Sequence, residues 1–170
     1  MTLDDLASPE YRALLRTLHA SAKWGGAGKS HAGLVTEFAR VVGARTILDY
    51  GCGRDTLKDA LGSEFETRSF DVGIESKDTL PEPADLVVAT DVLEHVEPDR
   101  LDHVLDHVRE LTLKGMFAIV ALSLSKVSLP DGRNSHLIVK RADWWADVLK
   151  RRGFRIFRKE MRKGLWVWMR

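Results

Sequence analysis

Residues 46–55, Thr-Ile-Leu-Asp-Tyr-Gly-Cys-Gly-Arg-Asp, constrain the fold of this chain more than any other segment. The apolar run that ends at Asp49 is typical of a buried parallel strand. Gly51 and Gly53 follow, and glycine allows a sharp turn and a close approach of a ligand to the backbone. Asp55 then begins a helical pattern, as its N-cap. The segment predicts a strand, a tight loop and a helix; for two glycines alone, an ordinary strand-to-helix turn is the alternative.

Helical and strand patterns alternate along the rest of the chain. We expect helices at residues 8–21, 55–61, 98–113 and 142–151, with another ending at residue 42, and strands at residues 46–49, 66–71, 85–90, 117–122, 154–159 and 165–169. This alternation predicts an α/β fold, in which a doubly wound, Rossmann-like sheet is mostly parallel and has an antiparallel last strand.

The length of 170 residues suits a single domain with a full core. We expect residues 1–43 to form N-terminal helices with a lid, and residues 44–170 to form the Rossmann-like core. No apolar run is long enough to cross a membrane, and the first residues lack the basic start and apolar middle of a signal peptide. The expectation is a cytoplasmic protein without membrane contact, either a monomer or a weak homodimer.

Cysteine content and charge narrow the chemistry further. Cys52 is the only cysteine, so it has no disulfide partner, and we expect a small residue that fills tight space rather than a nucleophile. Residues 150–170 hold nine Lys or Arg and one acid, Glu160. This basic end is either a surface for nucleic acid or the solvated face of a terminal hairpin, and the alternating apolar residues around it favour the hairpin.

A second acid, Asp71, lies 22 residues after Asp49 at the end of the next predicted strand. This is close to the interval of about 20 residues at which an acid receives ribose hydroxyls in such folds. The cofactor is not predicted to be NAD, because Thr56 replaces the third glycine of a dinucleotide loop and Asp55 places an anion where a diphosphate would bind. A phosphate-free, cationic nucleoside such as S-adenosylmethionine avoids this repulsion, and Asp91 would add a further carboxylate.

Two segments in the correct order, residues 49–53 and 84–96, resemble the first and fourth motifs of class I S-adenosylmethionine-dependent methyltransferases. The resemblance covers residues 45–160. It implies that the strand-one acid and glycines hold the methionine part, that the strand-two acid takes the ribose, and that the segment 91–95 borders the site of methyl transfer. The residues that would bind the cofactor are Asp49, Gly51, Gly53, Asp71, Asp91, Val92 and Trp24. More narrowly, the chain is similar to small methyltransferase-like proteins of phages and bacterial gene clusters, through its Trp-Gly segment and its Gly-Arg-Asn-x-His-Leu segment.

The chain departs from the family between its second and third strands. Residues 72–83, which include two prolines, are too few for the helix and strand that the family usually has there. We therefore expect one shortened sheet edge. Adenine would then be held by this loop, with Ile74 and Leu80 as apolar covers and Asp78 or Thr79 as polar candidates.

Methyl transfer from a sulfonium is an in-line displacement, so positioning supplies much of the acceleration and a base is needed only for an acceptor that loses a proton. The catalytic candidates are His136 and Asn134, in the loop after the fifth strand, and His95; His31 and Glu94 are further candidates for a base. The glycine-rich segment from Lys23 to His31 suggests a lid, with a helix-to-helix turn around a buried Trp24 as the alternative. We predict no metal site.

The sequence therefore predicts a methyltransferase that uses S-adenosylmethionine and acts on an oxygen or nitrogen of a small polar acceptor. One alternative is methylation of a nucleic acid or modified nucleotide, through the basic C-terminus. The other is a catalytically silent module that binds the cofactor and acts through a partner.

Overall fold

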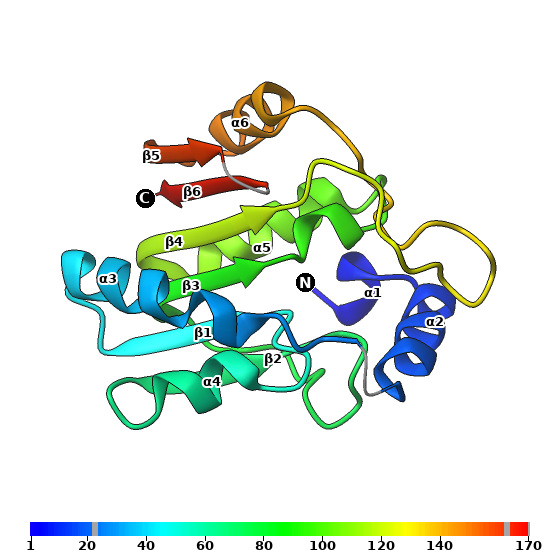
Figure 1. Cartoon of the computed structure of the whole chain (residues 1–170), viewed down its shortest axis with the longest axis horizontal. Helices are drawn as coiled ribbons and strands as arrows, with labels where there is room; N and C mark the ends of the chain where they lie inside the picture. Colours follow the sequence, from blue (N-terminus) through cyan, green and yellow to red (C-terminus); the bar gives the residue numbers. More distant parts are fainter. Residues whose placement is uncertain (22–23, 162–163, 170) are drawn as a thin grey trace.

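In the computed structural model, which describes residues 1–21, 24–161 and 164–169, the chain folds around a six-stranded sheet (Figure 1). The strands are β1 (Thr46–Tyr50), β2 (Glu66–Phe70), β3 (Ala84–Thr90), β4 (Thr112–Val120), β5 (Ile156–Met161) and β6 (Leu165–Met169). Their order is β2-β1-β3-β4-β6-β5. The first four are parallel, whereas β6 pairs antiparallel with both β4 and β5. The predicted Rossmann-like sheet with an antiparallel last strand is confirmed.

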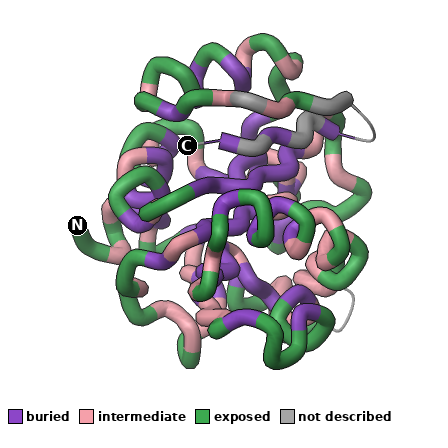
Figure 2. The backbone as a smooth tube through the Cα atoms, turned by 90° about the vertical axis from the view of Figure 1, so that its left-hand side faces the viewer, coloured by how far each residue is buried: buried purple, intermediate pink, exposed green. Residues whose placement is uncertain are grey.

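Helices cover both faces of this sheet. The helices of the chain are α1 (Leu3–Leu6), α2 (Pro9–His19), α3 (Ala32–Val42), α4 (Thr56–Leu61), α5 (Leu101–Leu111) and α6 (Ala142–Arg151), with short 3-10 turns η1 (Gly28–His31) and η2 (Leu93–His95). Helices α3 and α4 lie on one face of the sheet, and α5 and α6 lie on the other. Side chains alternate along β3, so Leu86 and Val88 join a cluster with α3 and α4, whereas Val87 and Ala89 join one with α5 and α6. The buried residues gather in the central strands, between exposed outer surfaces (Figure 2).

Strand β2 lies at the edge of the sheet, and residues 72–83 run from it into β3 without forming another helix or strand. Because these twelve residues hold two prolines and make only a short path, no further strand can form beyond β2. The shortened edge expected from the sequence is therefore present.

The boundary between α5 and β4 differs from its prediction. The helix expected at residues 98–113 begins at Leu101 and ends at Leu111, and the following strand begins at Thr112 instead of residue 117. Leu113, the expected last residue of this helix, lies in the strand and is 63% exposed. Pairing with β3 begins already at Thr112, since the backbone there is extended. The hydrogen bonds of the sheet thus override the local pattern.

Helices α1 and α2 lie beside the edge of the sheet where β1, β3 and β4 end (Figure 1). Ser8 caps α2, accepting a hydrogen bond from the Tyr11 N–H at 3.1 Å, and Pro9 stands at its first turn. Tyr11 and Leu15 pack with Ala7 and Leu129 in a third apolar cluster. Within the described residues, every helix is too short or too polar to cross a lipid bilayer.

Candidate active site

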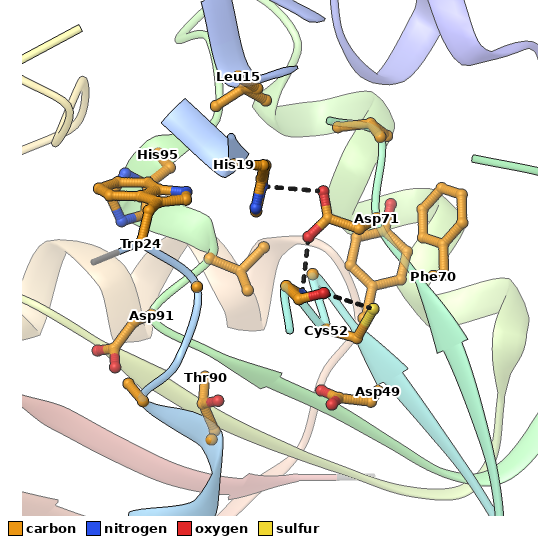
Figure 3. Close-up of a pocket in the computed structure, with 18 of the residues that line it drawn as sticks. Leu15, His19, Trp24, Asp49, Cys52, Phe70, Asp71, Thr90, Asp91 and His95 are labelled. Atoms are coloured by element: carbon orange, nitrogen blue, oxygen red, sulfur yellow. Dashed lines mark hydrogen bonds and ion pairs between the residues drawn. The ribbon is translucent and has the colours of Figure 1, made fainter. Parts of the chain in front are cut away.

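A cavity of about 570 Å³ opens at the carboxyl ends of β1 and β3 (Figure 3). Its floor is the loop after β1 together with Asp71, Thr90 and Asp91 from the ends of β2 and β3. Its opposite wall comes from α1, α2 and residues 24–28. The volume is within the range of about 300–1,000 Å³ that is typical of small-molecule sites.

Both glycines of the loop after β1 have positive φ, 76° at Gly51 and 50° at Gly53. A Cβ added to Gly53 would lie 2.5 Å from the Gly25 carbonyl oxygen, and one added to Gly51 would lie 2.5 Å from a Val92 methyl group. The Arg54 N–H donates to the same Gly25 oxygen at 2.8 Å. The backbone of Gly25 thus occupies the space beside Gly53, and the Val92 side chain occupies the space beside Gly51. Residues 24–28 are therefore docked on the glycine loop.

Cys52, between these glycines, is buried, and its thiol lies 3.8 Å from the Gly53 carbonyl oxygen. Burial and the nearby carboxylates of Asp71 and Asp49 raise the pKa of the Cys52 thiol. A thiol that resists ionisation is a poor nucleophile, which agrees with the predicted packing role.

Asp49 lies at the bottom of the cavity and is 3% exposed. Burial, followed by the negative charges of Asp55 and Asp71, raises its pKa to about 7. A positively charged group placed beside this carboxyl would favour its ionised form.

Asp55 differs from its predicted role. It stands at the N-cap position of α4, but it has φ 60°, its side chain makes no cap hydrogen bond, and it is not part of the cavity lining. Its carboxylate instead accepts a hydrogen bond from Lys77 Nζ at 2.6 Å, and Lys77 also donates to the Gly53 carbonyl oxygen at 2.8 Å. Burial would raise the pKa of Asp55, yet the bond from Lys77 holds it below the usual value. Lys77 therefore neutralises the charge that was expected to repel a diphosphate.

Asp71 lines the cavity, and its carboxylate is already engaged on both oxygens. Oδ2 accepts the Gly53 N–H at 2.9 Å, and Oδ1 accepts the Gly73 N–H at 2.9 Å and lies 3.5 Å from His19 Nε2. Burial would raise the pKa of Asp71, but these partners, His19 first, hold it below the usual value. A carboxylate offers about four lone-pair sites, so one site on Oδ2 remains for a ligand while His19 stays in place.

Asp91, which follows β3, lines the cavity and has φ 55°, a left-handed conformation that is strained for a residue with a side chain. Its N–H donates to the Ile119 carbonyl oxygen at 3.0 Å, which fixes this turn to β4. His31, at the end of η1, has its Nε2 atom 3.8 Å from the Asp91 carboxylate. Val92 also lines the cavity, above Gly51.

Trp24 and His95 meet over the cavity, with ring centroids 5.1 Å apart at an angle of 79° (Figure 3). The Tyr11 hydroxyl donates to the His95 carbonyl oxygen at 2.6 Å, so α2 holds the turn η2 in place. Burial, and then the neighbouring His136, lower the pKa of His95 to about 4. A neutral imidazole is therefore expected at ordinary pH. Trp24 thus lines the cavity and packs against His95; Lys23, where we expected a lid to begin, lies outside the described residues.

Glu94 is fully buried behind the cavity. Its Oε1 accepts the Ala121 N–H at 2.7 Å, whereas Oε2 has no hydrogen-bond partner. Burial raises the pKa of Glu94 to about 8.

His136 and Asn134 lie in the loop after β4 and do not line the cavity. The His136 ring packs against the His95 ring, with centroids 4.7 Å apart. The Asn134 amide accepts from the N–H groups of Ser125 and His136 at 3.0 Å and donates to the Ser125 carbonyl oxygen at 2.9 Å. Asn134 thus shapes the loop and positions His136, and its amide has no contact with the cavity.

The loop predicted to hold adenine lies differently. Among its residues, Val72 lines the cavity, whereas Ile74, Asp78, Thr79 and Leu80 do not. The loop turns back on itself because the Asp71 N–H donates to the Lys77 carbonyl oxygen at 3.0 Å. Leu80 is 38% exposed, and Asp78 lies 3.5 Å from Arg16.

Three cavity residues from α2 escaped the sequence analysis: Tyr11, Leu15 and His19. They are spaced four residues apart and therefore share one helix face. The helical pattern could have indicated this face, but nothing in the sequence places α2 over the ends of the strands.

Solved structures with the same architecture include several methyltransferases, all at low sequence identity. One is an N1-methyltransferase of 1,6-didemethyltoxoflavin from Burkholderia thailandensis, solved with bound S-adenosylhomocysteine. It is 17% identical in sequence and has a TM-score of 0.69, and the match covers 96% of this chain and 89% of the enzyme. The chain has the class I methyltransferase fold.

Other structures extend this likeness. A mitomycin 7-O-methyltransferase is 16% identical with a TM-score of 0.63, covering 92% of this chain and 60% of its own. A [4+2]-cyclase, 15% identical with a TM-score of 0.57, covers 78% of this chain and 58% of its own. No family model matches the sequence, and no curated protein matches it. Since the cyclase shares the methyltransferase fold, the fold leaves the reaction to be argued from the site.

Proposed function

We propose that this chain is an S-adenosylmethionine-dependent methyltransferase that acts on an oxygen or nitrogen atom of a small polar acceptor. The observation that carries the proposal is the cavity over the glycine loop, where the carboxyl groups of Asp49, Asp71 and Asp91 come together at the ends of three neighbouring strands. Ligands bind at this edge of open α/β sheets.

The carboxyl groups fit the chemistry of the cofactor. S-adenosylmethionine carries a sulfonium and an ammonium but no phosphate, and a buried acid such as Asp49, whose pKa is about 7, gains its charge most easily beside a cation. The remaining lone-pair site on Asp71 Oδ2 can accept one ribose hydroxyl. The cavity volume of about 570 Å³ leaves room for the cofactor and part of an acceptor.

When bound, the cofactor supplies an electrophilic methyl group. The residues of this chain would position the two reactants and exclude water. Trp24 and the docked segment 24–28 cover the glycine loop, and Leu6, Tyr11 and Leu15 form an apolar wall that would hold the body of an acceptor. Because positioning supplies much of the rate of a bimolecular displacement, this enclosure suits the reaction.

The neighbours supply further support. The N1-methyltransferase of 1,6-didemethyltoxoflavin binds S-adenosylhomocysteine together with 1,6-didemethyltoxoflavin, and the second neighbour is named as a 7-O-methyltransferase of mitomycin. A small-molecule acceptor is also favoured over nucleic acid, because at least two of the nine basic residues near the C-terminus are paired with acids: Arg158 with Glu37 at 3.0 Å and Lys159 with Asp143 at 3.0 Å.

A second candidate is a module that binds the cofactor without transferring its methyl group. The cyclase with the same fold favours it, since its reaction is not a methyl transfer. The test is release of S-adenosylhomocysteine when the chain is incubated with S-adenosylmethionine and a panel of small phenols, hydroxy acids and amines. Acceptor-dependent release supports the methyltransferase. Saturable cofactor binding without release on any acceptor supports the silent module, and no binding refutes both.

A further inference from the structure

Glu94, His95 and His136 form a cluster that the sequence analysis did not assign to a metal. We propose that these three side chains bind a divalent transition-metal ion at the edge of the cavity. One potential ligand atom from each residue lies within 4.8 Å of the others. They come from two places in the chain, η2 after β3 and the loop after β4, which the parallel sheet brings to the same edge.

Both imidazoles have the hydrogen-bond pattern of metal-binding histidines, in which one ring nitrogen meets a backbone carbonyl oxygen. His95 Nδ1 lies 2.7 Å from the Ser135 carbonyl oxygen, and His136 Nδ1 lies 2.5 Å from the Ser123 carbonyl oxygen. A carbonyl oxygen only accepts, so each Nδ1 carries the proton and each Nε2 offers a lone pair. Histidine ligands of metals usually donate their other ring N–H to a carbonyl or carboxylate in this way, which fixes the tautomer and the direction of the ring.

Glu94 supplies the carboxylate. Its side chain is fully buried, and Oε2 has no hydrogen-bond partner although Oε1 accepts the Ala121 N–H. A buried carboxylate oxygen without a partner is costly, and a bound cation is a partner that would remove the cost.

Hydrogen bonds to their backbone groups hold all three residues in place. Tyr11 binds the His95 carbonyl oxygen, the Ile138 N–H donates to the Glu94 carbonyl oxygen at 3.0 Å, and Asn134 accepts the His136 N–H. In a metal complex with bonds of about 2.0–2.2 Å, neighbouring ligand atoms lie about 3–3.5 Å apart. Binding would therefore draw the side chains inward by small rotations, without a change in the loops.

The ligand set defines the class of ion. Two neutral imidazoles and one carboxylate suit Zn²⁺, Co²⁺, Mn²⁺ or Fe²⁺, whereas Mg²⁺ and Ca²⁺ prefer oxygen ligands alone. Three protein ligands also leave a coordination position open, as in catalytic metal sites. His95 lines the cavity, which would place the ion at the cavity edge; resting on the proposed function, an open position there would orient an acceptor through an oxygen atom.

The experiment is a titration of the untagged chain, stripped of metal by a chelator, with Co²⁺, and visible absorption monitors the binding. Competition with Zn²⁺ and metal analysis after dialysis then measure the affinity and the number of ions bound. We expect about one ion per chain. Glu94→Gln, which retains an oxygen that can accept the Ala121 N–H, and His136→Ala should each weaken Co²⁺ binding at least about 100-fold. The matched control is His103→Ala, an exposed histidine on α5, which should bind Co²⁺ as the unchanged chain does.

The open position has its own readout. Acetohydroxamate, a small oxygen ligand, should change the absorption of the Co²⁺ form, and an unchanged spectrum would refute the open position. The site would be overturned by the lack of a saturable Co²⁺ band, or by Co²⁺ binding in Glu94→Gln and His136→Ala that equals binding by the unchanged chain. Far-UV circular dichroism confirms that each variant is folded, and His136→Ala decides alone if Glu94→Gln does not fold. The titration contains no S-adenosylmethionine, so its failure is distinct from failure of the proposed function.

Discussion

Gly53→Ala tests whether residues 24–28 are docked on the glycine loop in solution. Gly53 has φ 50°, and an added Cβ would lie 2.5 Å from the Gly25 carbonyl oxygen and 2.8 Å from its Cα. These are backbone atoms that cannot rotate away, so the docked segment would have to move. The hydrogen bond from the Arg54 N–H to the same oxygen would be lost or weakened.

Gly43→Ala is the matched control. Gly43 also has a left-handed backbone, with φ 64°, at the end of α3, but an added Cβ would meet no atom within 4 Å. A side chain in this conformation costs about 1–2 kcal/mol at either position. At Gly53, overpacking adds about 1–3 kcal/mol and the lost hydrogen bond about 0.5–1.5 kcal/mol. The expected loss of unfolding free energy is therefore about 1–2 kcal/mol for Gly43→Ala and about 2.5–6.5 kcal/mol for Gly53→Ala.

Urea unfolding followed by far-UV circular dichroism measures both losses, because a change in midpoint at constant slope reports stability. The difference between the two variants isolates the contact with Gly25. Equal losses would refute the docking of residues 24–28 on the glycine loop.

Three further predictions concern the carboxylates of the site. Asp71→Ala should weaken S-adenosylmethionine binding by about 1.5–3 kcal/mol through lost charge-assisted hydrogen bonds; an unchanged affinity in calorimetry would remove Asp71 from the site. Asp49 has a pKa of about 7, so below that pH a bound cation must displace its proton, and affinity should fall by up to about tenfold per pH unit as the pH drops toward 5; a flat pH profile of the dissociation constant would contradict this. Lys77→Met removes the partner of Asp55 and a donor to Gly53, and should lower the free energy of unfolding by about 1–2 kcal/mol; a stability in urea equal to that of the unchanged chain would show that the pair contributes nothing.

The sequence predicted the sheet well because its strands carry strong local signals. The run before Asp49 and the run 85–90 are apolar on both faces, as a parallel strand between two helix layers requires. The twelve residues 72–83 predicted the shortened edge by length alone. Local signals failed at residues 112–116, where we expected the end of a helix and then a connection, but pairing with β3 already makes the backbone a strand.

The site was less predictable because it depends on contacts between distant segments. The motifs placed Asp49, Asp71 and Asp91 at one edge of the sheet, but not the pairing of Asp55 with Lys77, nor the lone-pair sites on Asp71 that His19 and two backbone N–H groups occupy. The approach of His95 to His136 also joins loops far apart in sequence. Spacing along the chain carries no signal for such contacts.

The central claim is that the cavity over the glycine loop binds S-adenosylmethionine. The direct test is calorimetric titration of the intact chain with S-adenosylmethionine, repeated in the presence of NAD. We expect saturable binding at one site per chain, and we expect that NAD neither binds there nor displaces the ligand. The reason is that the carboxyl groups of Asp49, Asp71 and Asp91 favour a cationic ligand and disfavour a diphosphate. Binding of NAD at this site, or no binding of S-adenosylmethionine, would contradict the claim.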